Sequence, residues 1–183
     1  MTTGKVTITA PNGMHARPAG ELVKLIRGFA PARITLRTAA REASAVSILS
    51  LLALGLKHGT EVEVCAEGGD EAAAVRAVAE AGRFHAALER AKAELSALAE
   101  GEAVFAAHLE MAGDPMLAGL VEGRIAEKHL SAEQALGEAC EEVCGMFAAL
   151  DDDYLRGRTD DVRDVCARIG RILSGETAHD PFA

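Results

Sequence analysis

Alternation of apolar and polar residues predicts strands in the first third of the chain. Apolar residues stand at every second position in segments 5–10, 33–37 and 60–66, and a weaker alternation covers 42–45. Successive side chains of a strand point to opposite faces, so each segment would bury one face of a sheet. We therefore expect a small antiparallel sheet that is covered on one side.

Helical spacing of apolar residues interrupts these strands. Segment 16–27 repeats apolar residues at helical intervals and is followed by Gly28, a typical helix stop. A short helix at 47–54 would end at Gly55, and a third helix would begin after Asp70, its N-cap. The element order βαββαβα predicts an α+β fold, an open-faced antiparallel sandwich with helices on one face of the sheet.

Strand signals disappear after Gly82. Two later segments carry apolar residues at alternating spacings of three and four, which is typical of helices that pack almost parallel. These residues are Phe84, Leu88, Ala91, Leu95 and Leu98, then Leu136, Ala139, Val143, Met146 and Leu150. A capping box of Ser131 with Gln134 and an Asp114-Pro115 helix start complete the pattern of an all-α bundle of four or five helices.

The same pattern divides the chain into three parts. Residues 1–82 form the α+β domain, 83–173 form the helical bundle, and 174–183 form a frayed tail without periodicity. Charge is distributed unequally: the first 82 residues carry nine Lys/Arg and eight Asp/Glu, whereas the remainder carries ten and twenty. Two units of net charge +1 and −10 would attract each other or each other's partners.

Composition excludes several classes of function. The chain has 183 residues, 49% of them apolar, and a net charge of −9, with no Trp and one Tyr. Few aromatic rings and a negative charge argue against nucleic-acid binding. No apolar run reaches the length of a membrane span, so we expect no membrane insertion and a cytoplasmic protein.

Metal and cofactor sites are not expected. The four cysteines lie outside any Cys-x-x-Cys pair and are predicted to be buried thiols. The run Asp151-Asp152-Asp153 has metal-ligand composition, but neighbouring residues at a helix start point in different directions, which favours helix capping.

His15 is the candidate reactive residue. It precedes a predicted helix whose first turn contains Arg17 and Pro18. Proline is tolerated there because first-turn amides have no partner within the helix. The remaining amides, the positive end of the helix dipole and the Arg17 guanidinium would all favour a phosphate on the imidazole.

The segment Ala10-Pro-Asn-Gly-Met-His-Ala-Arg-Pro-Ala19 resembles the active-site motif of HPr, the histidine phosphocarrier of the sugar phosphotransferase system. The resemblance extends from Lys5 to about Gly82. It implies that His15 takes a phosphoryl group from enzyme I and passes it to an enzyme II component, and that Arg17 supports the phosphate. It also implies that partners dock over the first two helices. The residue pattern predicts an exposed surface in the same region, since the apolar residues of the second helix cannot all be buried and the first helix has a basic outer face. The residues expected to form this docking surface are Ala16, Gly20, Lys24, Arg27, Ile48, Leu49 and Leu52.

Ser47 has two interpretations. It aligns with the serine that a dedicated kinase phosphorylates in some members of the HPr family. Its position before the second predicted helix also suits a helix N-cap.

The acidic half resembles the helical subdomain of enzyme I, the part that docks HPr. The resemblance is carried by segments 103–110, 113–115, 149–156 and 161–165. It implies docking through His108, Glu110, Met111, Met116 and Leu117, with His108 as a structural or interface residue rather than a catalyst.

Features that enzyme I requires for self-phosphorylation are missing from this sequence. The late histidine, His179, lacks the Gly-rich surroundings of the enzyme I phosphohistidine, and no phosphoenolpyruvate-binding barrel follows. The chain thus resembles a fragment of a multiphosphoryl transfer protein, whose acceptor would be an enzyme II component or a dihydroxyacetone kinase. The alternative is a regulatory module in which the acidic bundle docks, in cis or in trans, on the HPr face and occludes His15.

Overall fold

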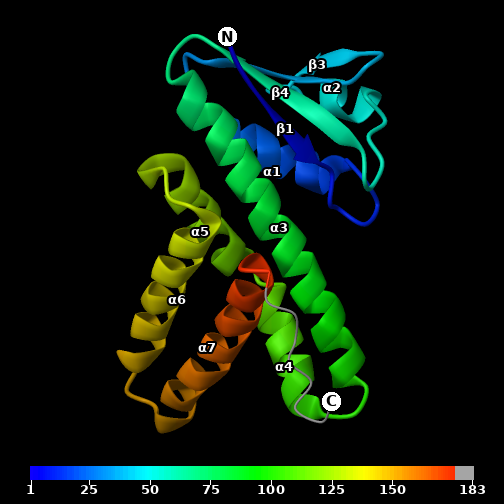
Figure 1. Ribbon diagram of the computed structural model, residues 1–183. Coiled ribbons are helices and arrows are strands. Elements are labelled where there is room, and N and C mark those ends of the chain that lie inside the picture. Colours follow the sequence, from blue (N-terminus) through cyan, green and yellow to red (C-terminus); the bar gives the residue numbers. More distant parts are fainter. Residues whose placement is uncertain (176–183) are drawn as a thin grey trace. The chain divides into compact units, whose positions relative to one another are not determined.

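The structure is a computed structural model that describes residues 1–175. The described strands are β1 (Thr2–Thr7), β2 (Arg33–Arg37), β3 (Glu42–Ser44) and β4 (Glu61–Glu67). The described helices are α1 (Ala16–Arg27), α2 (Ile48–Ala53), α3 (Glu71–Ala99), α4 (Ala103–Ala112), α5 (Pro115–Lys128), α6 (Ala132–Ala148) and α7 (Asp153–Leu173). Their order, traced in Figure 1, confirms the predicted βαββαβα arrangement followed by helices.

The chain forms two compact units. The first contains Met1–Ala86 together with Glu122–Ser131, and the second contains Ala87–Val121 together with Ala132–Ala183. Helices α3 and α5 therefore contribute residues to both units. The first unit holds the sheet, and the second consists of helices.

The sheet has four antiparallel strands in the order β1-β4-β2-β3. Strand β4 pairs with β1 on one side and with β2 on the other, with Leu36 opposite Val64 in the second pairing. Alternate residues of the central strands are buried, among them Ile34, Leu36, Val62 and Val64. This alternation confirms the half-buried strands that the sequence predicts.

Strand β1 is shifted toward the N-terminus of the segment that the pattern predicts. The alternation covers residues 5–10, whereas the strand spans Thr2–Thr7. Its pairing ends at Thr7 because the partner residue, Glu61, is the first residue of β4. After Ile8 the chain leaves the sheet and leads into the loop before α1.

The helix caps of the first unit follow from local chemistry. The Ser47 Oγ accepts a 3.2 Å hydrogen bond from the Ser50 amide at the start of α2, and Asp70 Oδ1 accepts one of 3.0 Å from the Ala73 amide at the start of α3. Both side chains satisfy amides that the helix itself leaves without acceptors. The capping role predicted for Ser47 is thereby confirmed.

Helix α3 continues through Gly82 without a break. Glycine in a helix interior costs about 1 kcal/mol relative to alanine, a cost that packing of neighbouring apolar residues can offset. Phe84, Leu88, Ala91 and Leu95 are all buried, as their spacing predicts.

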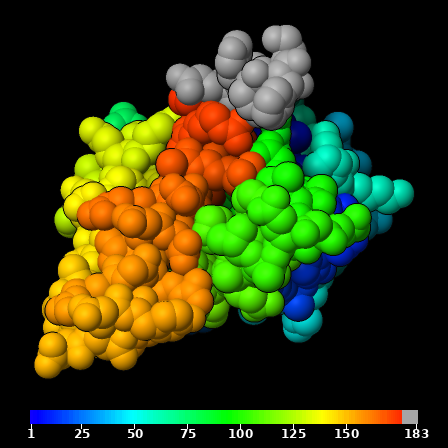
Figure 2. All heavy atoms as spheres, turned by 90° about the horizontal axis from the view of Figure 1, so that it is seen from below, coloured from blue at the N-terminus to red at the C-terminus, as the bar shows by residue number. Residues whose placement is uncertain are grey.

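The burial predicted for the two series of apolar residues in the helical part is wrong at their C-terminal ends. Leu98, Met146 and Leu150 are 41%, 45% and 42% exposed. All three positions lie in or beyond the last turns of α3 and α6. The end of α6 and the start of α7 lie at the surface, drawn in orange in Figure 2.

Charged and thiol side chains complete the packing of the second unit. Glu94 Oε2 of α3 accepts hydrogen bonds of 2.9 Å from Arg168 and 3.1 Å from Arg171 of α7. All four cysteines are free and buried, as predicted: Cys140, Cys144 and Cys166 lie in the second unit, and Cys65 lies in β4 of the first. Burial raises the pKa of the Cys144 thiol to about 11, which keeps the thiol protonated and unreactive at neutral pH.

Two further predictions concern the C-terminal tail and membrane insertion. Residues 176–183, which include His179 and most of the predicted tail, lie outside the described residues. Among residues 1–175, no helix is both long enough and apolar enough to cross a membrane.

Candidate functional site

The loop before α1 is held by backbone contacts. The Met14 amide donates a 2.8 Å hydrogen bond to the Leu56 carbonyl, and the Gly13 amide donates one of the same length to Ala10. Gly13 is buried and has φ +71°, a left-handed conformation that favours glycine. The loop thus enters α1 along a defined path that ends at His15.

His15 is the N-cap residue of α1 and is exposed. Its carbonyl accepts a 3.0 Å hydrogen bond from the Ala19 amide, but its ring makes no capping hydrogen bond. The ring is therefore not occupied in stabilising the helix. Beside it are the first-turn amides of Ala16 and Arg17, which have no acceptor within the helix, whereas Pro18 has no amide hydrogen.

Arg17 lies in the same first turn with its side chain 65% exposed. Its Nε donates a 3.2 Å hydrogen bond to Oε1 of Glu21, one turn later. An exposed pair of this kind contributes only about 0.2–0.5 kcal/mol, so the guanidinium can leave Glu21 for a stronger acceptor such as a phosphate at low cost.

The predicted docking positions of the first unit lie on α1 and α2. Ile48 is 39% exposed and Leu49 is 79% exposed, while Leu52 is half-buried. A Cβ placed on Gly20 would lie 4.0 Å from Ile48 Cδ1, so the two helices meet there. The remaining positions on α1 are exposed: Ala16, Lys24 and Arg27. We call these seven residues the α1–α2 surface.

The positions implied for docking in the second unit are only partly at the surface. His108 and Leu117 are each 6% exposed and cannot contribute to an exposed face in this conformation. Both side chains pack in the core of the second unit, and the docking role implied for them stays a prediction. Glu110 and Met116 are exposed, and Met111 is half-buried.

His108 has a structural partner. Its Nε2 lies 3.1 Å from Asp161 Oδ1, and Arg158 donates a 2.9 Å hydrogen bond to the other oxygen of Asp161. The hydrogen bonds from His108 and Arg158 lower the pKa of Asp161. This network joins α4 to α7 inside the second unit.

We expect Asp161→Asn to destabilise the second unit by about 1–3 kcal/mol at pH 7, since it removes charge-assisted hydrogen bonds from a largely buried pair. A carboxyl group whose pKa is lowered on folding stabilises the folded state at pH values above its ordinary pKa of about 4. This stabilisation is lost as the pH falls through the lowered pKa. The difference from wild type should therefore shrink as the pH falls below about 4. Urea unfolding followed by circular dichroism measures this.

The neighbouring Asp160 provides the control for this experiment. Its side chain is 87% exposed and lies 3.5 Å from Arg163. Asp160→Asn should change stability by less than about 0.5 kcal/mol. Equal effects of the two substitutions at every pH would contradict a stabilising role for the network.

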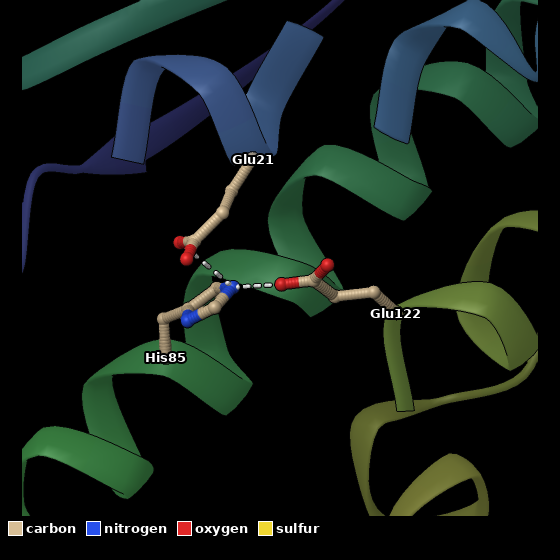
Figure 3. A group of neighbouring side chains, drawn as sticks. All are labelled: Glu21, His85 and Glu122. Atoms are coloured by element: carbon tan, nitrogen blue, oxygen red, sulfur yellow. Dashed lines mark hydrogen bonds and ion pairs between the residues drawn. The ribbon is translucent and has the colours of Figure 1, made fainter. Parts of the chain in front are cut away.

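A further cluster of polar side chains is absent from the sequence-based predictions. Glu21 of α1, His85 of α3 and Glu122 of α5 converge within the first unit (Figure 3). His85 Nε2 lies 2.6 Å from Glu122 Oε1 and 3.8 Å from Glu21 Oε2. No motif signals the cluster, because each residue comes from a different helix and none is close to the others in sequence.

Two family models match the chain. Residues 2–83 match the one described as "PTS HPr component phosphorylation site". Residues 52–158 match the one described as "PEP-utilising enzyme, N-terminal", and this match covers more than half of the chain.

Individual relatives agree with these families. A phosphoenolpyruvate-protein phosphotransferase of Bacillus sp. (strain S) is 38% identical over 128 residues, which are 63% of this chain and 22% of the relative. The protein of the same description from Enterococcus faecalis is 40% identical over 113 residues, 56% of this chain and 20% of the relative. A solution structure of Enzyme I (nEIt) is 31% identical with a TM-score of 0.52, covering 55% of this chain and 44% of that one.

The chain spans about a fifth of the length of the curated relatives that it matches. Its sheet-containing part carries the HPr match, and the match to the enzyme I type continues through its helices. The chain therefore belongs to the family of PEP-utilising enzyme N-terminal domains, and it carries an HPr domain of the phosphotransferase system ahead of the helical part.

Proposed function

We propose that the chain is a phosphoryl carrier: His15 accepts a phosphoryl group from an enzyme I phosphohistidine and passes it to an enzyme II component or a dihydroxyacetone kinase. The observation that carries this proposal is the position of His15, exposed at the start of α1 with a ring that makes no capping hydrogen bond. The match of residues 2–83 to a phosphorylation-site family supports it.

Transfer at this site requires positioning and charge stabilisation rather than a cofactor. A bond forms between an imidazole nitrogen of His15 and phosphorus while the phosphorus–nitrogen bond of the donor breaks. Negative charge on the three phosphoryl oxygens would meet the first-turn amides, the helix dipole and the Arg17 guanidinium. These donors are in place before the reaction, so little reorganisation is needed when the phosphoryl group arrives.

Partner proteins would approach over the α1–α2 surface. Its centre is apolar, with Ile48 and Leu49 exposed, and its rim carries Lys24 and Arg27. An apolar centre with a charged rim is the usual composition of a protein interface. We propose that an acidic partner docks here and thereby presents its own phosphorylated or phosphate-accepting histidine to His15.

The second unit offers a different surface for docking. Glu110, Met111 and Met116 remain available after His108 and Leu117 are assigned to the core. We propose that these three residues contact the basic face of a phosphocarrier. Methionine side chains adapt to varied apolar partners, and the acidic residue complements a basic rim.

Ser47 is proposed as a site of regulation in addition to its role as N-cap. A phosphate at the start of α2 would suit the amides there electrostatically, so the helix need not unfold. It would, however, place nearly two negative charges beside exposed Ile48 and Leu49. Docking of an acidic partner on the α1–α2 surface would then weaken.

The proposal is tested by incubating the chain with phosphoenolpyruvate, magnesium and a complete enzyme I. Intact mass spectrometry should show a gain of one acid-labile phosphate, and none when enzyme I is omitted. Peptide mapping under alkaline conditions should place that phosphate on His15.

Three other outcomes would count against the carrier function. Phosphate on any residue other than His15 would disprove the assigned site. Transfer that occurs only at high salt would support the regulatory alternative, since salt weakens attraction between the acidic and basic parts. No transfer under either condition would disprove the carrier proposal for this chain.

A further inference from the structure

We propose that Glu21, His85 and Glu122 form a binding site for a divalent transition metal, with Zn²⁺ as the best-suited ion. This inference is independent of phosphoryl transfer at His15. It rests on three side chains that bring metal-binding atoms together inside the first unit, as Figure 3 shows.

The donor atoms are already close together. The ligand atoms of the three side chains all lie within 4.8 Å of one another. His85 Nε2 is 2.6 Å from Glu122 Oε1 and 3.8 Å from Glu21 Oε2. Bonds of about 2.0–2.1 Å in a tetrahedral zinc site place neighbouring ligand atoms about 3.3 Å apart. The observed distances fall on either side of that value, so small side-chain rotations would open a position for the ion.

The chemical types of the donors select the ion. One imidazole nitrogen with carboxylate oxygens suits zinc, whereas magnesium and calcium prefer sites made of oxygen alone. Two carboxylates and a neutral imidazole would also balance the charge of a divalent ion. With three protein ligands, a fourth position would remain for water or an external ligand.

Burial is intermediate, which suits a site that an ion can enter. The side chains of Glu21, His85 and Glu122 are 30%, 27% and 12% exposed. Partial removal from water strengthens the attraction between the carboxylates and a cation. An entry path remains because Glu21 and His85 each retain exposed surface.

Glu21 can bind the ion without losing its existing partner. Arg17 bonds to Oε1 of Glu21, whereas Oε2 of the same carboxylate is the atom that faces His85. Arg17 would thus orient a ligand from outside the coordination sphere, as hydrogen-bonded neighbours of metal ligands commonly do.

The alternative is that a protonated His85 simply pairs with the two carboxylates. That arrangement explains the 2.6 Å contact to Glu122 equally well. The two possibilities differ in one measurable property, because an ion pair without a metal site would show no stoichiometric uptake of zinc.

The test is a calorimetric titration of the full chain, without phosphate, with zinc chloride at pH 7. Wild type should bind one equivalent, and zinc should raise its melting temperature. Glu122→Gln keeps the side-chain shape but removes a charged ligand, and His85→Ala removes the nitrogen. Each should lower the affinity for zinc by at least about tenfold.

His58→Ala is the matched control, since His58 is an exposed histidine that is not part of the cluster and whose Nδ1 lies 3.2 Å from the Thr9 carbonyl. It should bind zinc as wild type does. Circular dichroism of each variant separates loss of the site from loss of the fold, and Glu122→Gln provides the test if His85→Ala fails to fold. The proposal is overturned if wild type shows no saturable binding, or if both cluster variants bind zinc as tightly as wild type.

Discussion

His15→Ala is expected to abolish uptake of phosphate from phosphorylated enzyme I while leaving the fold intact. The exposed ring makes no capping hydrogen bond, so its removal should change the free energy of unfolding by less than about 0.5 kcal/mol. The loss of transfer should be complete, because alanine offers no nitrogen to bond with phosphorus. Intact mass after incubation with enzyme I and phosphoenolpyruvate, together with a thermal melt, measures both effects.

Substitution of the neighbouring arginine should have an intermediate effect. Arg17→Ala retains His15 but removes the guanidinium group. We expect transfer to slow by about 10²–10³-fold, as when a hydrogen-bond donor to the charge of a transition state is removed. His58→Ala, which changes a different exposed histidine, should transfer at the wild-type rate. A phosphorylated His15→Ala protein, or equal losses in all three variants, would contradict the proposed roles.

Gly13→Ala is expected to be the most destabilising substitution near the site. A Cβ at this position would lie 2.3 Å from the Leu56 carbonyl oxygen and 3.0 Å from Lys57 Cα, and the backbone has φ +71°. Neither neighbour is a flexible side-chain end, so the backbone must move. Left-handed strain of about 1–2 kcal/mol and overpacking of about 1–3 kcal/mol together predict a loss of about 2–5 kcal/mol.

The same substitution should also slow phosphoryl transfer. Moving Gly13 away from Leu56 would break the 2.8 Å hydrogen bond from the Met14 amide and displace the chain just before His15. A displacement of about 1 Å can cost about 100-fold in rate when reacting groups must be aligned. Denaturant unfolding and the transfer assay, performed on the same protein sample, measure the two effects.

Gly55→Ala separates backbone strain from steric conflict. Gly55 also has a positive φ, +62°, but a Cβ there would meet no atom within 4 Å. Its substitution should cost about 1–2 kcal/mol of strain alone and leave transfer unchanged. If Gly55→Ala were as destabilising as Gly13→Ala, the contact with Leu56 would not be the cause.

Local pattern was sufficient to predict most of the elements. Strand β2 and helix α1 occupy the predicted residues 33–37 and 16–27, because each pattern is long enough to distinguish a period of two from one of 3.6. The caps at Ser47 and Asp70 were likewise predictable, since a capping side chain acts on an amide only three residues away.

Predictions were less accurate where an element depends on its neighbours. The pattern of alternation continues past Thr7, yet β1 ends there because its partner strand does. The spacing of apolar residues continues to Leu98 and Leu150, yet both side chains are exposed. Periodicity reports which face of a segment is apolar, but not how far another element covers it.

The residues of the candidate site likewise fall into those that local sequence could predict and those that it could not. The motif around His15 and Arg17 is contiguous, so the sequence alone is enough to predict a phosphate-binding helix start there. Burial of His108 and Leu117 could not be read in this way, because both positions lie on helices whose orientation depends on packing. The contact of His108 with Asp161 spans 53 residues of sequence.

The sequence by itself determined the order of the elements, the caps and the histidine at the start of α1, because these depend on interactions between residues a few positions apart. Only the tertiary structure decided that Glu21, His85 and Glu122 meet, and that Gly13 lies against the Leu56 carbonyl. Such contacts arise when separate elements pack together, and packing depends on the shapes of whole surfaces rather than on any local repeat.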